Sequence, residues 1–128
     1  MSVADDVLVL RAEYRGLVIE WDEAKDTAAK ANRVFDRLHQ CYKRLRESDA
    51  GRRAISGLID DPVTPVRLSA AAHSLAWQPA AAQAVLEKIE SQPTGLYAVT
   101  AKWTLRSYRQ GKLNLGDGPS SQLPDAAH

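Results

Sequence analysis

Apolar residues recur at alternating intervals of three and four positions along most of this 128-residue chain. That spacing places side chains on one face of an α-helix, and the two-residue alternation of a β-strand cannot produce it. It runs through residues 7–21 and again through residues 28–45, at Val7, Leu10, Tyr14, Leu17, Trp21, Ala28, Ala31, Phe35, Leu38, Tyr42 and Leu45. We therefore predict two amphipathic helices, the second over residues 27–48. The short polar segment between them makes them antiparallel neighbours.

Four further helices are predicted over residues 50–59, 65–76, 79–90 and 96–110. Ser48 or Asp49 can cap the first of these, and Thr64 followed by Pro65 is a typical start signal for the next. Residues 65–76 are small and apolar nearly all round, which predicts a buried central helix. In the last helix, the residues predicted to face inward are Leu96, Val99, Thr100 and Trp103, with Ala101, Leu105 and Tyr108 widening the apolar face.

Six helices joined by short connections predict an all-α fold of three antiparallel helical hairpins. The length of the chain is that of a single domain, which we place at residues 1–115. Residues 116–128 are rich in Gly, Ser and Pro and hold little apolar surface. We expect them to form a flexible C-terminal tail, because too little burial is available to offset the entropy of ordering them.

Residues 61–71 resemble the hallmark of a HEAT repeat, in which Asp-Pro, a later proline, Val-Arg and paired alanines mark the turn and the second helix; here these are Asp61-Pro62, Pro65, Val66-Arg67 and Ala70-Ala71. Residues 7–113 also resemble a small bacterial family, domain of unknown function 2019, through residues 31–38 and 65–71. The resemblance implies hairpins stacked as a short HEAT-like α-α superhelix and brings no established activity. It further implies that Arg67 and Asp61 tie neighbouring repeats together. The third hairpin, residues 79–110, lacks this Asp and Arg pair.

Cellular location is indicated by three features of the sequence. Cys41 is the one cysteine, the N-terminus shows no secretory signal pattern, and no apolar stretch approaches the ~18 residues that span a bilayer. These features predict a cytoplasmic protein that does not enter membranes. The formal net charge of +1 does not by itself indicate a nucleic-acid partner.

Catalytic and metal-binding patterns were sought and not found. His39 and Cys41 lie two positions apart and point in different directions on a helix, and His73 belongs to another helix. Asp60 and Asp61 stand in a proline-rich turn, where carboxylates usually act as caps. No phosphate-binding loop or nucleophile motif is present. We therefore predict a protein that is not an enzyme and holds no metal or cofactor.

Basic residues form a stripe on the second predicted helix, and the last helix repeats it. The members are Lys30, Arg33, Arg37 and Arg44 on the second helix, and Lys102, Arg106 and Arg109 on the last. Residues 1–23 carry two positive and six negative charges, a balance of −4, whereas residues 24–55 carry nine positive and four negative charges, a balance of +5. The stripe is either a solvated flank that pairs with the acidic first helix or a groove for an anionic partner.

Two functional hypotheses follow. The first is a protein-interaction module, for which an immunity protein that occludes a cognate toxin is the concrete example; repeat stacks supply extended concave surfaces for such a role. The second is a nucleic-acid-binding protein that uses the basic stripe on its concave face.

The three tryptophans, Trp21, Trp77 and Trp103, are predicted to pack in the core, with an exposed interface anchor as the alternative.

Overall fold

The computed structural model describes residues 3–24, 26–92 and 95–112 and shows an all-α fold. The elements are α1 (Val3–Glu23), α2 (Ala28–Arg46), α3 (Asp49–Ser56), a 3₁₀ turn η1 (Gly57–Asp60), α4 (Thr64–Ser74), α5 (Pro79–Glu90) and α6 (Leu96–Arg109). The six predicted helices and their order are confirmed. The predicted tail, residues 116–128, lies outside the described residues. None of the described helices is long and apolar enough to cross a lipid bilayer.

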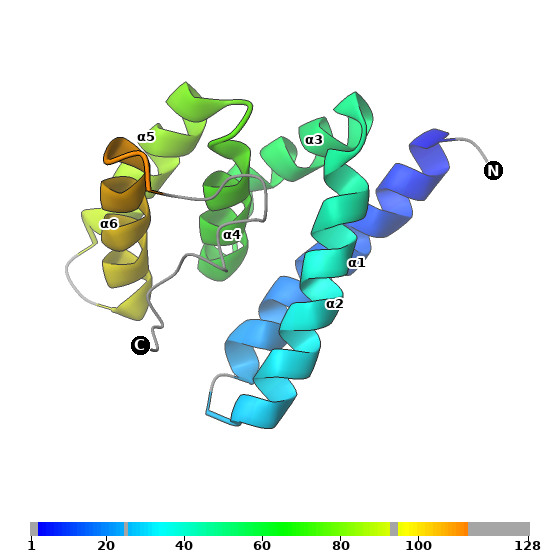
Figure 1. Ribbon diagram of the computed structural model, residues 1–128, viewed down its shortest axis with the longest axis horizontal. Helices are drawn as coiled ribbons and strands as arrows, with labels where there is room; N and C mark the ends of the chain where they lie inside the picture. The colour runs from blue at the N-terminus through cyan, green and yellow to red at the C-terminus, as the bar shows by residue number, and fades with distance from the viewer. Residues whose placement is uncertain (1–2, 25, 93–94, 113–128) are drawn as a thin grey trace.

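The first hairpin is formed by α1 and α2, which lie antiparallel and side by side (Figure 1). Their apolar rows meet along the seam, with the rings of Trp21 and Phe35 6.1 Å apart near the connection. Tyr14, Leu17 and Leu38 are almost completely buried there. The 3-4 spacing therefore predicted both the helices and the faces that they bury.

The second hairpin begins at Ser48, whose side chain accepts a hydrogen bond from the Gly51 N–H at 3.0 Å. This confirms one of the two caps predicted for α3. The predicted helix 50–59 is wrong in its last turn, because the chain tightens into the 3₁₀ turn η1 at Gly57. The N-cap of α4 is Val63, so Thr64 is the first helical residue rather than the cap, and it makes no capping hydrogen bond.

The helix α4 lies between the first and third hairpins (Figure 1). Its Val66 and Ala70 belong to a core cluster shared with α1, α2 and α3, whereas Ala71 and Leu75 belong to a second cluster shared with α5 and α6. Alanines at this crossing allow neighbouring helices to approach closely. The prediction of a buried, alanine-rich central helix is therefore confirmed.

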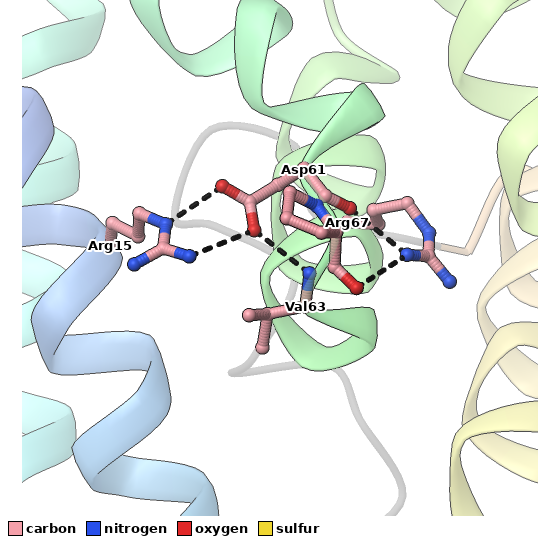
Figure 2. A network of polar contacts seen from close by, with 5 residues as sticks. Arg15, Asp61, Val63 and Arg67 are labelled. Carbon is pink, nitrogen blue, oxygen red and sulfur yellow. Dashed lines mark hydrogen bonds and ion pairs between the residues drawn. The ribbon is translucent and has the colours of Figure 1, made fainter.

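A network of polar contacts at Asp61 joins the first hairpin to the second (Figure 2). The Arg15 guanidinium of α1 donates to both carboxylate oxygens of Asp61, at 2.7 and 3.2 Å. The Val63 N–H donates to the same carboxylate at 2.9 Å. Asp61 thus orders the turn that precedes α4 and fixes it to α1. The hydrogen bond from Arg15 holds the pKa of Asp61 below its usual range, although partial burial opposes that shift.

The implied tie between Arg67 and the Asp61 carboxylate is wrong. Arg67 instead donates to the backbone carbonyl oxygens of Asp61 and Pro62, at 2.9 and 3.2 Å, and to the Thr64 hydroxyl at 2.9 Å. The Arg67 side chain thus folds back over the turn that precedes α4 and bonds within its own segment. The cation that links the hairpins comes from α1, which the sequence motif does not contain.

Removing the Asp61 carboxylate should weaken the junction in two steps. Asp61→Asn keeps an oxygen for the Val63 N–H and loses the ion pair, so the free energy of unfolding should fall by about 1 kcal/mol. Asp61→Ala also loses the hydrogen bond from the Val63 N–H and should cost about 2 kcal/mol. Urea unfolding followed by circular dichroism measures both variants. Equal losses for the two would show that the hydrogen bond to Val63 contributes nothing.

Candidate interaction surfaces

The helix α6 presents an apolar row to solvent, which we call the α6 row: Leu96, Val99 and Trp103. Their side chains are 60%, 49% and 42% exposed. The Arg106 guanidinium lies over the Trp103 ring, 4.9 Å from its centroid, and this contact partly orients the ring. Large apolar side chains in a row beside cations are more typical of a binding surface than of a solvated helix face.

The predicted orientation of α6 is therefore wrong. Ala101, Thr104 and Leu105 form its buried face, with Tyr97 and Tyr108 partly buried beside them. Both faces of α6 carry apolar residues at helical spacing, so the pattern cannot choose between them. Trp103 does not pack in the core as predicted, whereas Trp21 and Trp77 do pack against it. The Trp77 indole also donates to the Ser56 hydroxyl at 2.8 Å.

The four basic residues predicted on the second helix, Lys30, Arg33, Arg37 and Arg44, are all exposed on α2. Arg37 approaches Glu20 of α1 at 3.8 Å, and both side chains remain open to solvent. Such a pair contributes well under 1 kcal/mol, so α1 neutralises little of the stripe through it. The stripe is therefore exposed to solvent and has one weak tie to the acidic helix.

An open groove of about 300 Å³ runs along the seam of α1 and α2, lined by Glu13, Asp36, Arg37, Gln40, Cys41 and Arg44. Acidic and basic side chains therefore alternate beside the stripe, which weakens its attraction for a polyanion. The Cys41 thiol donates to the Leu10 carbonyl oxygen at 3.3 Å, and burial raises its pKa to about 12. A thiol held in this protonated form is a poor nucleophile.

The predicted basic residues of the last helix lie apart from the α2 stripe, since α4 stands between the two helices in Figure 1. Lys102 and Arg106 flank the α6 row, and Arg109 pairs with Glu87 of α5 at 2.6 Å. The seven predicted partner-binding residues thus form two separate surfaces rather than one groove. The α6 row, which the sequence pattern assigned to the core, is exposed to solvent beside Lys102 and Arg106.

A buried polar network was also missed. The Tyr14 hydroxyl lies 2.6 Å from His73 Nδ1 and 2.8 Å from Ser69 Oγ, and the Tyr42 ring stacks on His73 with centroids 3.9 Å apart. Burial lowers the pKa of His73 to about 3 and raises that of Tyr14. No signal could have revealed this pairing, because 59 residues separate the two side chains. The network joins α1, α2 and α4, with Tyr14, Tyr42 and His73 buried and Ser69 partly buried at its edge.

Three comparisons place the chain among known proteins. It matches none of the curated proteins. A crystal structure of the protein RPA1889 from Rhodopseudomonas palustris is similar to it, with a TM-score of 0.78, 26% sequence identity, and coverage of 89% of this chain and 98% of that one. The family model for domain of unknown function 2019 matches residues 9–108. That match covers most of the chain, and the chain therefore belongs to this family, as its resemblance at residues 31–38 and 65–71 predicted.

Proposed function

We propose that the protein is a non-catalytic protein-binding module, and that its partner docks on the solvent face of α6. The α6 row carries this proposal, because it exposes three large apolar side chains on one helix face, Trp103 among them. Burying such side chains in an interface contributes on the order of 1.5–3 kcal/mol each before ordering costs.

The charges around the row indicate the kind of partner. Lys102 and Arg106 stand beside it, and α6 contains no acidic residue. A complementary surface therefore has an apolar centre and an acidic rim. Tryptophan and arginine dominate interface energetics more often than other residues, so Trp103 with Arg106 over its ring is the expected centre of binding.

The family brings no activity, so the biological role is proposed from the build of the molecule. Successive hairpins and the proline turn at residues 61–65 support a HEAT-like stack, an architecture that offers binding faces rather than catalytic pockets. Occlusion of a cognate toxin, as by an immunity protein, is the role we propose for such a face. A cytoplasmic location is supported by the single, buried, protonated thiol of Cys41.

Capture of the product of a neighbouring gene tests the proposal. The purified protein should retain that product, and Trp103→Ala should weaken the complex at least about tenfold, because the ring and its contact with Arg106 are both lost. Arg53→Ala, an exposed change on α3, serves as the control and should bind as the wild type does. Protection of cells against a toxic product should follow the same order. Equal binding by wild type and Trp103→Ala would remove α6 as the docking face.

A second candidate is nucleic-acid binding by the exposed cations of α2. The observation in its favour is the row Lys30, Arg33, Arg37 and Arg44, of which only Arg37 has an ion pair that the described residues show within 4 Å. Duplex DNA binding should then weaken steeply with salt and fall when Arg33, Arg37 and Arg44 become alanine. Absence of binding at low salt would exclude this candidate. The acidic residues of the adjoining groove make it the weaker one.

A further inference from the structure

A second unpartnered face lies on α1. Leu8 and Val9 are 61% and 63% exposed, and Ala12 and Gly16 follow them on the same side of the helix. We call Val9, Ala12 and Gly16, spaced by three and four positions, the α1 row. This face lies opposite the buried Tyr14 and Leu17, so no element of the described chain covers it.

Gly16 is the unusual member of the α1 row. A glycine inside a helix costs about 1 kcal/mol relative to alanine. A Cβ placed on Gly16 would meet nothing within 4 Å, so the fold of the described chain does not require glycine there. With Ala12 beside it, Gly16 leaves this part of the helix without a large side chain, so a large side chain from outside could approach the backbone closely.

The α6 row has the same spacing and the opposite shape. Leu96, Val99 and Trp103 are also separated by three and then four positions. When the two helices are laid parallel, Leu96 meets Val9, Val99 meets Ala12 and Trp103 meets Gly16. Large side chains then face small ones, as in the interdigitation of helices that share a seam with a repeat of seven.

The charges beside the two rows agree with this alignment. Along one edge of the α1 row stand Glu13 and Glu20, seven positions apart, and along the facing edge of the α6 row stand Lys102 and Arg109, also seven apart. In parallel helices such edges lie across from each other and select the partner. The remaining edges place Arg15 across from the uncharged Thr100 and Ser107.

We propose that the α6 row is occupied by the α1 row of a second copy of this chain. This inference rests on the proposed function, because it names the occupant of the docking face on α6. The α1 and α6 rows are different surfaces on two helices, which approach each other where Tyr97 of α6 donates to the Asp22 carboxylate of α1 at 2.7 Å. A contact between two different patches is heterologous, so each bound copy leaves one α1 row and one α6 row free. Association therefore continues from copy to copy in a head-to-tail series.

Complementation between two disabled variants tests the head-to-tail contact. Val9→Glu disables the α1 row and Trp103→Glu disables the α6 row, and each variant alone should remain monomeric in sedimentation equilibrium where the wild type forms larger species. An equimolar mixture of the two should form a dimer and nothing larger, because one intact α1 row meets one intact α6 row. Ala29→Glu on α2 and Ala84→Glu on α5 place the same charge at other exposed sites and should associate as the wild type does.

Gly16→Leu gives an independent test, because it places a large side chain at the smallest member of the α1 row. The variant should keep its helical circular dichroism spectrum, since a Cβ at Gly16 meets nothing within 4 Å, and it should raise the dissociation constant of self-association at least about tenfold. Unchanged association by Gly16→Leu, or a mixture of Val9→Glu and Trp103→Glu that stays monomeric, would overturn the proposed seam.

The outcomes separate this inference from the function on which it rests. A wild type that stays monomeric up to about 1 mM, while Trp103→Ala still loses the product of the neighbouring gene, would show that α6 docks a different protein. The proposal that a second copy occupies the α6 row is then wrong, and the proposed protein-binding function is retained. If Trp103→Glu changes neither self-association nor capture, the protein-binding function of α6 is wrong as well.

Discussion

Replacing Gly51 with alanine should lower the free energy of unfolding by at least about 3 kcal/mol. A Cβ at Gly51 would overlap the backbone of Leu45, lying 2.6 Å from its carbonyl carbon and 2.9 Å from its Cα, with the carbonyl oxygen nearer still. Backbone atoms at the end of α2 cannot rotate away as a flexible side chain could. The turn between α2 and α3 must therefore open, and the cap from Ser48 to the Gly51 N–H is strained with it.

Gly57→Ala is the matched control for this prediction. Gly57 stands in the same hairpin with φ near −66°, and a Cβ there meets nothing within 4 Å. Alanine should stabilise the protein by about 0.5–1 kcal/mol, because it reduces the freedom of the unfolded chain. Urea unfolding of both variants gives the two free energies. Similar values for the two would contradict the close approach of Gly51 to Leu45.

Acidification should unfold the protein through His73. The folded-state pKa of His73 is about 3, whereas in the unfolded chain it is near its ordinary value of 6.5. Below pH 6.5 His73 binds a proton in the unfolded state but not in the folded state, so the free energy of unfolding falls as the pH falls. The contribution of neutral His73 to stability is complete only above pH 6.5. The expected slope is about 1.4 kcal/mol per pH unit, or about 2.7 kcal/mol between pH 6.5 and 4.5.

The window above pH 4.5 separates His73 from the Asp61 carboxylate, whose lowered pKa makes its own loss of stability begin at lower pH. The groups that face His73 are Tyr14 from α1, Tyr42, His39 and Arg46 from α2, and Ser69 within α4. Urea unfolding across this window measures the slope. His73→Gln, which cannot titrate, should be less stable at pH 7 and should lose most of the slope; an unchanged slope would exclude His73 as its cause.

The sequence predicted those parts of the fold that depend on spacing within one helix. The rows of α1 and α2, the alanine-rich α4 and the cap at Ser48 are all local patterns, and all are confirmed. Contacts between helices were harder to predict. The partner of Asp61 is Arg15, 46 residues away, and nothing in the motif around Arg67 indicates which cation lies opposite the carboxylate in space.

The exposed face of α6 could not be predicted from the sequence either. Periodicity finds apolar rows but does not say which of two rows on one helix meets the core. On α6 the row with Ala101 and Leu105 is buried, because a small residue such as Ala101 lets the helix approach α4 and α5 more closely than Trp103 would. The other row, with Trp103, is exposed to solvent. A helix that is apolar on two faces is thus itself a signal of an interaction surface.

The helix α4 contributes residues to both core clusters, so the molecule cannot be divided there without exposing apolar surface. Neighbouring residues of α4, Ala70 and Ala71, belong to different clusters, so a cut on either side of that helix exposes apolar surface that its own fragment cannot cover. Neither the first two hairpins nor the last one is a self-sufficient unit. Fragments cut on either side of α4 should therefore unfold more readily than the intact chain.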